Sequence, residues 1–368
     1  MLEVLYAVVL VAAVLAGYVL LLRFRVVAAS GSAAGDVCAI VPARNEQASL
    51  PALLESLDRS SVPVRVLVID DASTDATAAL AREAGVEVIS PGTPAPGWTG
   101  KAWACHVGAN STDAELLLFL DADTVLASGA LGGIVDLHRR FGGLISVQPY
   151  HRVQRTYEQL SAYFNAVAVM ASGVFASGVG RRPMAFGPCL LTSRDDYERA
   201  GGHAAVRGEI LDDVELAAAY EKAGLSVHCV AGGSQIRMRS YPNGIRQLVA
   251  GWTKNMASGA AATDPRAGLA TGLWICAHHL VAVNTLFALW TAAGDADEAP
   301  AAGIWLLAWV VFALQLRVIL RRVGSFRWWT WAMFPLPLLA FDLLFAISTV
   351  NTLRGSVRWR GRTVRLGA

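Results

Sequence analysis

Residues 116–123 read Leu116-Leu117-Leu118-Phe119-Leu120-Asp121-Ala122-Asp123. The five consecutive apolar residues predict a buried β-strand, and two carboxylates stand at its end. Carboxylate oxygens are ligands that Mg²⁺ and Mn²⁺ prefer. An Asp-x-Asp sequence alone is weak support for a metal site, because such triplets are common at strand ends. Its weight depends on whether other polar residues converge on the same edge of a sheet.

Short apolar runs and helical patterns alternate around this strand. They predict strands at residues 37–41, 64–69, 86–89, 115–120 and 144–147, with helices at 47–57, from Ser73 or Thr74 to about 84, and at 101–109. A return to the sheet is expected at 186–191, followed by helices from Ser193 and over 211–223. This alternation indicates an α/β domain with a parallel sheet over residues 37–235. Ligands of such sheets bind beyond the carboxyl ends of the strands.

Polar residues cluster at those strand ends. We assign to nucleotide contacts Pro42, Ala43, Arg44, Glu46, Asp70, Asp71, Lys101, Asp121 and Ala122, and to a metal Asp121 and Asp123. Asp70 and Asp71 could accept hydrogen bonds from a base or ribose, or only favour the start of the next helix. Lys101 could reach a phosphate, or be a solvated surface lysine.

Asp213 is the candidate general base. It follows Asp212 at the start of a predicted helix, where a carboxylate could take a proton from an acceptor hydroxyl. The alternative is that both residues only stabilise the first helical turn.

The composition favours a membrane protein. Hydrophobic residues make up 54% of the chain and charged residues 16%, with a mean hydropathy of +0.44. The net charge of +2 is too small to indicate nucleic-acid binding. The five cysteines form no Cys-x-x-Cys pair, so neither a disulfide framework nor a zinc site is indicated.

Apolar segments flank the α/β domain. Residues 4–22 are long enough to span a bilayer, and Arg23 and Arg25 follow, so residues 1–25 are expected to form an uncleaved anchor with the domain on the cytoplasmic side. A C-terminal membrane region is expected at 265–352, with apolar segments at 267–292, 302–318 and 328–350. Three full spans would put the basic tail, residues 353–368, outside, against the charge rule, so one segment is expected to be re-entrant or interfacial. The last is suspect because Pro335-Leu336-Pro337 interrupts it.

Two amphipathic segments are candidates for contact with a lipid acceptor. Residues 158–179 and 240–258 carry large apolar side chains at helical spacing. The stripe in 240–258 could equally pack on the domain. We assign to the acceptor Gln148, His151, Trp252 and Lys254. Within the membrane region, His278, His279 and Asp342 invite a functional reading, with a structural helix–helix hydrogen bond as the alternative.

Four motifs in this order resemble the family 2 glycosyltransferases with a GT-A fold. They are Val41-Pro42-Ala43-Arg44-Asn45-Glu46, Ile69-Asp70-Asp71-Ala72-Ser73-Thr74-Asp75, Phe119-Leu120-Asp121-Ala122-Asp123 and Asp212-Asp213-Val214-Glu215-Leu216. Further runs, including Gly97-Trp98-Thr99-Gly100-Lys101, Gly201-Gly202-His203 and Gly251-Trp252-Thr253-Lys254, are similar to the membrane glycosyltransferases of carotenoid biosynthesis. Hopanoid-associated and ceramide glucosyltransferases are more distantly similar.

The resemblance implies a Rossmann-like GT-A domain with transmembrane helices, a UDP-sugar donor, Mn²⁺ or Mg²⁺, and inversion at the anomeric carbon. By position, Asp71 would contact the nucleotide, Asp123 would bind the metal, and Asp213 would be the base. Leu211-Asp212-Asp213 departs from the usual Thr-Glu-Asp pattern. The chain has no Gln-x-x-Arg-Trp run, which weakens a reading as a processive polysaccharide synthase.

We therefore expect a membrane enzyme that moves a sugar, glucose being the first choice, from a UDP-sugar to a carotenoid carboxylate or hydroxyl. A carboxylate is already ionised at neutral pH, since a free carboxyl titrates near ~4, so only a hydroxyl acceptor needs Asp213. The alternatives are diacylglycerol, a hopanoid or a polyprenyl phosphate as acceptor, and a catalytically silent membrane scaffold.

Overall fold

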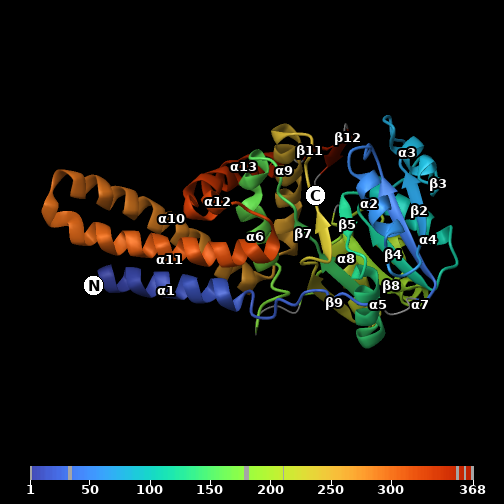
Figure 1. Cartoon of the computed structure of the whole chain (residues 1–368), viewed down its shortest axis with the longest axis horizontal. Coiled ribbons are helices and arrows are strands. Elements are labelled where there is room, and N and C mark those ends of the chain that lie inside the picture. The colour runs from blue at the N-terminus through green and yellow to red at the C-terminus, as the bar shows by residue number, and fades with distance from the viewer. Residues whose placement is uncertain are drawn as a thin grey trace. The chain divides into compact units, whose positions relative to one another are not determined.

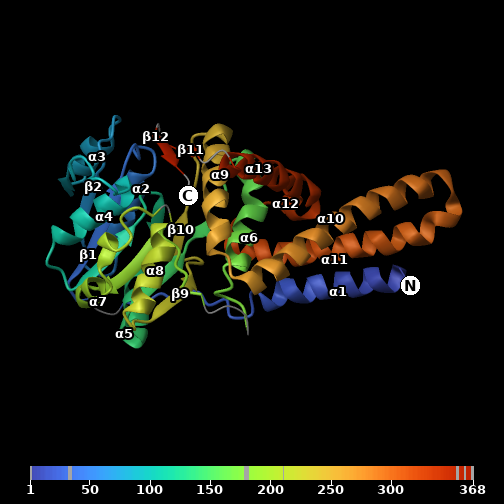
Figure 2. The same ribbon diagram turned by 180° about the vertical axis from the view of Figure 1, so that it is seen from behind.

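The computed structural model describes residues 2–31, 35–177, 182–209, 211–353, 356–359 and 362–365. The chain divides into two compact units (Figures 1 and 2). An α/β unit is drawn from residues 25–152 and 182–242, and a helical unit from residues 1–24, 153–181 and 243–368.

The α/β unit is built on a seven-stranded sheet in the order β3-β2-β1-β4-β8-β6-β9. The strands are β1 (Val37–Ala43), β2 (Arg65–Asp70), β3 (Glu87–Ile89), β4 (Leu116–Leu120), β6 (Leu144–Gln148), β8 (Cys189–Ser193) and β9 (Val227–Ala231). Neighbouring strands are parallel except that β8 runs antiparallel to β4 and β6. The predicted parallel sheet is confirmed for the strands that carry the first three motifs.

Helices cover both faces of the sheet. On one face lie α2 (Leu50–Asp58), α3 (Thr77–Glu83) and α5 (Ala130–Phe141), and on the other α4 (Gly100–Asn110), α7 (Arg194–Arg199) and α8 (Asp212–Lys222). Strand β1 serves both layers because successive side chains point to opposite faces: Val37, Ala39 and Val41 join the first core, and Cys38 and Ile40 the second.

A smaller three-stranded sheet joins distant parts of the same unit. It contains β5 (Thr124–Leu126), β10 (Ile236–Met238) and β7 (Tyr150–His151), with β10 in the centre. This sheet follows directly after Asp121-Ala122-Asp123, and the backbone N–H of Arg239 donates to the carbonyl of Asp123 over 3.2 Å. The second carboxylate of the motif is therefore held at the junction of the two sheets.

Two predicted helices differ from those observed. The helix expected from Ser73 or Thr74 begins at Thr77, because residues 73–76 hydrogen-bond to the loop after β1 instead. The helix expected over 158–179 is a short 3₁₀ turn, η1 (Tyr157–Ser161), followed by α6 (Ala162–Ala171). It ends there because Gly173 has φ +71°, a left-handed conformation that terminates helices.

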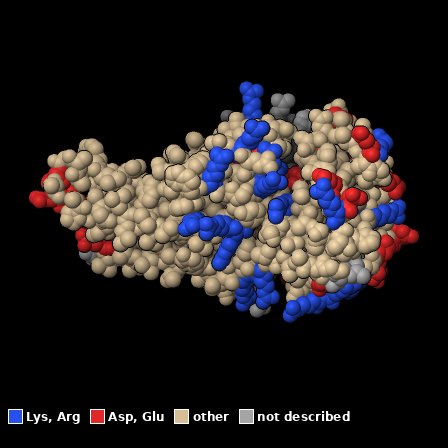
Figure 3. All heavy atoms as spheres, viewed as in Figure 1, with Lys and Arg blue, Asp and Glu red and all other residues tan. Residues whose placement is uncertain are grey.

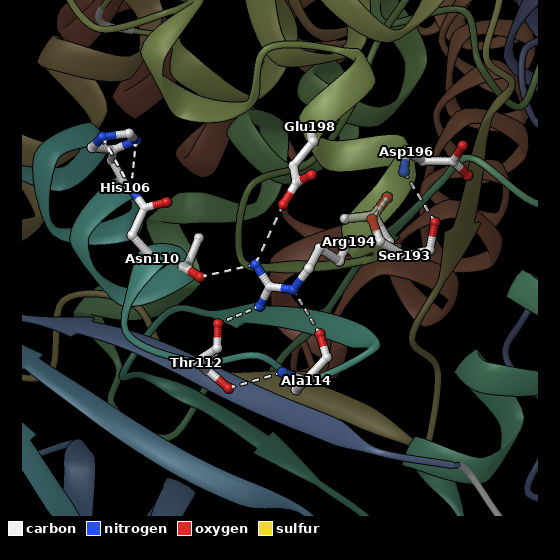
Figure 4. Close-up of polar contacts among 10 residues, drawn as sticks. His106, Asn110, Thr112, Ala114, Ser193, Arg194, Asp196 and Glu198 are labelled. Atoms are coloured by element: carbon white, nitrogen blue, oxygen red, sulfur yellow. Dashed lines mark hydrogen bonds and ion pairs between the residues drawn. The ribbon is translucent and has the colours of Figure 1, made fainter.

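Arg194 fixes the start of β4. Its guanidinium donates hydrogen bonds to the carbonyl oxygens of Ala109 in the last turn of α4 and of Thr112 and Ala114 in the connection to β4 (Figure 4). Its backbone N–H donates to the carbonyl of Glu115 over 2.8 Å. Because β4 is short and rigid, fixing its start also fixes the position of Asp121 at its end.

The helical unit contains the apolar segments of the chain. Its helices are α1 (Leu2–Val19), α6, α9 (Ile245–Ala262), α10 (Pro265–Gly294), η3 (Ala296–Glu298), α11 (Ala299–Val323), α12 (Trp328–Ala332) and α13 (Pro335–Leu353). Helices α10 and α11 form a long hairpin with α1 alongside, as both ribbon views show. The interruption expected at Pro335 is confirmed, since α13 begins at that residue. Two described strands, β11 (Ser356–Trp359) and β12 (Arg362–Arg365), form a hairpin in the tail.

Two segments, Pro265–Gly294 and Ala296–Val323, are long and apolar enough to cross a membrane, while Glu3–Val19 and Pro335–Asn351 are apolar but shorter. Figure 3 shows acidic side chains at the tip of the α10–α11 hairpin, an apolar surface along it, and basic side chains toward its other end. The connection between α10 and α11 carries Asp295, Asp297 and Glu298, and the C-terminal part of α11 carries Arg317, Arg321 and Arg322.

Polar contacts join the helices of this unit. His279 Nε2 lies 2.8 Å from Asp342 Oδ2, between α10 and α13. Trp274 Nε1 donates to Gln315 Oε1 over 2.9 Å, and Gln315 Nε2 donates to the carbonyl of Val14 in α1. A structural helix–helix hydrogen bond, the alternative reading of His279 and Asp342, accounts for their positions.

We predict that Arg194→Met lowers the free energy of unfolding by about 2–3 kcal/mol, because it leaves three carbonyl oxygens without their donor while keeping much of the aliphatic stem. Thermal unfolding of the full chain in detergent, followed by circular dichroism, measures the change. The matched control is Arg199→Met, whose exposed guanidinium pairs with Asp196 in the same helix and should change stability by less than about 0.5 kcal/mol. Equal effects of the two changes would contradict the role given to Arg194.

Candidate active site

The register of the sheet brings three strand ends together. Pro42 pairs with Ile69, and Ala43 with Asp70, while Phe119 of β4 pairs with Ile40. Since β1 lies between β2 and β4, the residues that follow all three strands meet at one edge. Polar residues from separate strands therefore converge on the edge that carries Asp121-Ala122-Asp123, which strengthens the interpretation of this motif.

Asp71 is held by the loop after β1. Its backbone N–H donates to the carbonyl of Ala43 over 2.9 Å, and Arg44 Nη1 donates to its carbonyl and to its Oδ2, over 3.0 and 3.2 Å. Asn45 and Ala72 in the two loops both have positive φ, 54° and 53°, which restricts both loops to one tight geometry. The structure therefore pairs two of the assigned nucleotide residues with each other, in a rigid setting.

A pocket opens beside this edge, between the start of α4, the end of β4 and the start of α8. Its lining includes Pro42, Lys101, Asp121, Gly187, Asp212 and Asp213, together with Cys105, Phe119, Leu120, Leu190 and His203. The candidate base and the first carboxylate of the Asp-x-Asp motif thus share one cavity, although they are far apart in the sequence.

Lys101 forms an ion pair, while 40% of its side chain stays exposed. Its Nζ lies 2.8 Å from Asp121 Oδ1. Burial alone would lower the pKa of Lys101, but the carboxylates of Asp121 and Asp212 raise it well above its usual value, so the ammonium stays charged. The pocket therefore holds a permanent positive charge next to the motif.

Asp213 has the properties of a base that works near neutral pH. The backbone N–H of Gly187 donates to its Oδ2 over 2.8 Å, which orients the carboxylate. Burial raises the pKa of Asp213 to about 6, and repulsion from Asp212 adds to this rise, while Lys101 and the Gly187 N–H oppose it. A carboxylate with this pKa is ionised at pH 7 and still binds a proton more strongly than a solvated one.

The metal-binding assignment receives partial geometric support. Asp121 lines the pocket, but Asp123 lies in the turn before β5 and is not among its lining residues. Among the described residues, no group of three or more His, Cys, Asp or Glu side chains could hold a metal ion. Two carboxylates fit Mg²⁺ or Mn²⁺ only where the oxygens of a bound diphosphate complete the coordination shell.

The four residues assigned to the acceptor are divided between the two units. Gln148 and His151 lie in the α/β unit, at β6 and β7, and do not line the pocket; His151 is buried. Trp252 lies on α9 of the helical unit, where its Nε1 donates to Ser161 Oγ over 3.0 Å and its ring stacks on Phe164. The apolar stripe of α9 thus packs within its own unit at Trp252. The side chain of Lys254 lies outside the described part of the structure.

Three further residues assigned to the nucleotide have structural contacts in the loops after β1 and β4. Ala43 and Ala122 are buried, and Glu46 donates its backbone N–H to Thr77 Oγ1 over 2.8 Å, which ties the first loop to α3.

His203 is a pocket residue that sequence reasoning did not assign. The hydroxyl of Tyr197 accepts the backbone N–H of His203 over 3.0 Å and lies 2.9 Å from its Nδ1. Burial lowers the pKa of His203 to about 3, so the ring is neutral. The run Gly201-Gly202-His203 was the only signal for it.

Comparison with known proteins agrees with this fold. The sequence matches the model of Glycosyl transferase family 2 over residues 38–198, and named relatives cover most of the chain. The chain therefore belongs to glycosyltransferase family 2 and is an enzyme of that family.

The particular relatives share one name. A 4,4'-diaponeurosporenoate glycosyltransferase of Staphylococcus aureus (strain MRSA252) is 34% identical over 330 residues, 88% of this chain and 86% of the relative. The protein of the same name from Staphylococcus haemolyticus (strain JCSC1435) is 36% identical over 252 residues, 67% of each chain. The similarity to glycosyltransferases of carotenoid biosynthesis thus extends well beyond the family motif region.

A solved structure shares the fold. The mannosyltransferase PcManGT from Pyrobaculum calidifontis, in complex with GDP-Man and Mn²⁺, has a TM-score of 0.53 and 17% identity, over 96% of both chains. The GT-A architecture with its Rossmann-like sheet is thereby confirmed.

Asp213→Asn tests the charge state of the pocket. A carboxyl whose pKa rises on folding destabilises the folded protein where it is ionised, so the penalty is absent below about pH 4 and complete above about pH 6. We predict that Asp213→Asn raises the free energy of unfolding by about 1–2 kcal/mol at pH 8 and leaves it unchanged at pH 4, since the amide oxygen can still accept the Gly187 N–H. Thermal unfolding at both pH values measures this. Exposed Glu215, changed to Gln, is the control, and an equal gain at both pH values would refute the raised pKa.

Proposed function

We propose that the chain is an inverting glycosyltransferase that moves a sugar from a UDP-sugar, UDP-glucose first, to a carotenoid acceptor at the membrane. The observation that carries this proposal is the shared pocket, in which oriented Asp213 lies with the Lys101–Asp121 pair. The relatives' name supports the acceptor class.

The donor would bind at the edge where β1, β2 and β4 end. Asp70, Asp71 and the loop after Pro42 would contact the nucleoside, and Lys101 a phosphate. Asp121 and Asp123 would hold Mn²⁺ or Mg²⁺, which supplies positive charge opposite the leaving diphosphate. Lys101 adds a fixed charge of the same sign, so the chain itself contributes to stabilising that leaving group.

The transfer is a single displacement. An acceptor oxygen attacks the anomeric carbon as the bond from that carbon to the β-phosphate oxygen breaks, which inverts the configuration and releases UDP. With a hydroxyl acceptor, Asp213 takes the proton; with a carboxylate acceptor, no proton has to move. Gln148, His151, Trp252 and Lys254 remain proposed acceptor contacts. The enzyme would sit in the cell membrane with several spans and its α/β unit in the cytoplasm.

The proposal predicts lipid-soluble labelled product when membranes containing the chain receive radiolabelled UDP-glucose, Mn²⁺ and carotenoids that end in a carboxylate or a hydroxyl. Diacylglycerol, a hopanoid and polyprenyl phosphate serve as competing acceptors. Asp123→Asn should reduce product at least ~100-fold, because the leaving diphosphate loses several kcal/mol of charge stabilisation. The control Asp113→Asn changes a fully exposed carboxylate and should have no effect. Absence of product with every lipid, or full activity of Asp123→Asn in a folded protein, would overturn the assignment.

The role of Asp213 depends on the acceptor. With a hydroxyl acceptor, kcat should fall as the pH drops through about 6, because protonated Asp213 cannot accept the proton, and Asp213→Asn should reduce kcat by about 10²–10⁴-fold. With a carboxylate acceptor, Asp213→Asn should retain most activity. Initial rates from pH 5 to 8 with both acceptors test this, and identical losses with the two acceptors would exclude the base role.

A further inference from the structure

A second pocket lies in the helical unit, where α11 ends and the chain turns into α12. It is lined by Arg317, Leu320, Arg321, Phe326, Trp328 and Trp331. Two guanidinium groups from one helix therefore share a hollow with aromatic rings from α12 and from the turn before it. Nothing in the proposed sugar transfer uses this pocket.

The two arginines carry unbalanced charge. They stand one helical turn apart on α11, and like charges at this spacing repel each other. Within the described ranges, neither has a carboxylate at ion-pair distance. The neighbouring Arg322 differs, because it donates to the carbonyl of Leu21 over 3.0 Å and lies over the ring of Phe24. The arrangement of Arg317 and Arg321 suits a bound anion.

The aromatic rings limit what that anion can be. The guanidinium of Arg317 lies 5.3 Å from the centre of the Trp331 ring, a cation–π contact that holds it beside the indole. Trp328 is 69% exposed, which is unusual for an indole in water but common in a lipid headgroup layer. A fixed guanidinium presents two parallel N–H donors, the geometry that matches phosphate.

The length of α11 places the pocket at headgroup depth. At about 1.5 Å per residue, the helix from Ala299 to Arg317 measures roughly 27 Å, close to the ~30 Å of a bilayer core. With the acidic loop Asp295–Glu298 at one surface, Arg317 and Arg321 would lie at the other. Their charges then meet the phosphates of that leaflet.

We propose that this pocket binds the phosphate of an anionic phospholipid, with Arg317 and Arg321 as hydrogen-bond donors and the indoles of Trp328 and Trp331 beside the glycerol backbone. The inference rests on the membrane location given under the proposed function. It adds a lipid site separate from donor, metal and acceptor. The two guanidinium groups should favour an anionic lipid, because a zwitterionic headgroup carries its own ammonium and has no net negative charge.

The test uses the full chain, delipidated in detergent and placed in nanodiscs of phosphatidylcholine alone or with phosphatidylglycerol. Lipid retained after transfer back to detergent is counted by native mass spectrometry. The wild type should retain phosphatidylglycerol at least about tenfold over phosphatidylcholine, and Arg317→Gln with Arg321→Gln should lose that preference. The control removes the same charge from exposed sites, Arg59→Gln with Arg139→Gln, and should keep it.

Three outcomes would overturn the site: equal retention of both lipids by the wild type, unchanged preference in the Arg317/Arg321 variant, or displacement of phosphatidylglycerol by an excess of inorganic phosphate, which would assign the pocket to a soluble anion. The wild-type comparison needs no substitution, so a variant that fails to fold leaves the test intact. Insertion into phosphatidylcholine nanodiscs alone reports on the membrane location, and labelled transfer reports on the enzyme. Failure of either is therefore distinguishable from failure of the lipid site.

Discussion

The active pocket depends on how negative charge is balanced around Lys101. Asp121, Asp212 and Asp213 line the same cavity, and among its lining residues Lys101 is the cation. The ammonium of Lys101 pairs with Asp121 and opposes the rise in the pKa of Asp213 that burial and Asp212 cause. Asp213 is left with a pKa of about 6, high for an aspartate. A diphosphate would add more negative charge, which is the physical reason the proposed donor requires a divalent cation with it.

This balance is set by the sheet. Strand register places Pro42, Asp70 and Asp121 at one edge, and the antiparallel strand β8 brings the Gly187 N–H to Asp213 from the other direction. Arg194, the first residue of α7, connects the start of that helix to the segment that leads into β4. The charged groups of the pocket are therefore carried by backbone that is itself hydrogen-bonded. This backbone keeps the charges at fixed separations and so maintains the raised pKa of Asp213.

Much of this could be predicted from the sequence, for identifiable reasons. Apolar runs such as 116–120 predict buried strands, and parallel strands collect the residues that follow them, so Asp121 and the first motif were foreseeable. The partner of a flexible side chain could not be predicted, because nothing in the local sequence distinguishes a Lys101 that pairs with Asp121 from a solvated lysine. The place of His203 could not be predicted, because its buried ring depends on a contact with Tyr197. An amphipathic stripe does not say which surface covers it, so the contact of Trp252 with Ser161 is visible only in the structure.

The N-terminal helix α1 packs closely against α11. Gly17 of α1 lies so close to α11 that an added Cβ would be 2.7 Å from Gln315 Nε2, and the same amide spans Val14 in α1 and Trp274 in α10. One side chain thus closes a three-helix junction whose polar atoms satisfy one another. A larger residue at position 17 would collide with this amide and move it away from the backbone carbonyl of Val14. The helix is an integral part of the bundle, so its sequence constrains which leaders the rest of the chain can tolerate.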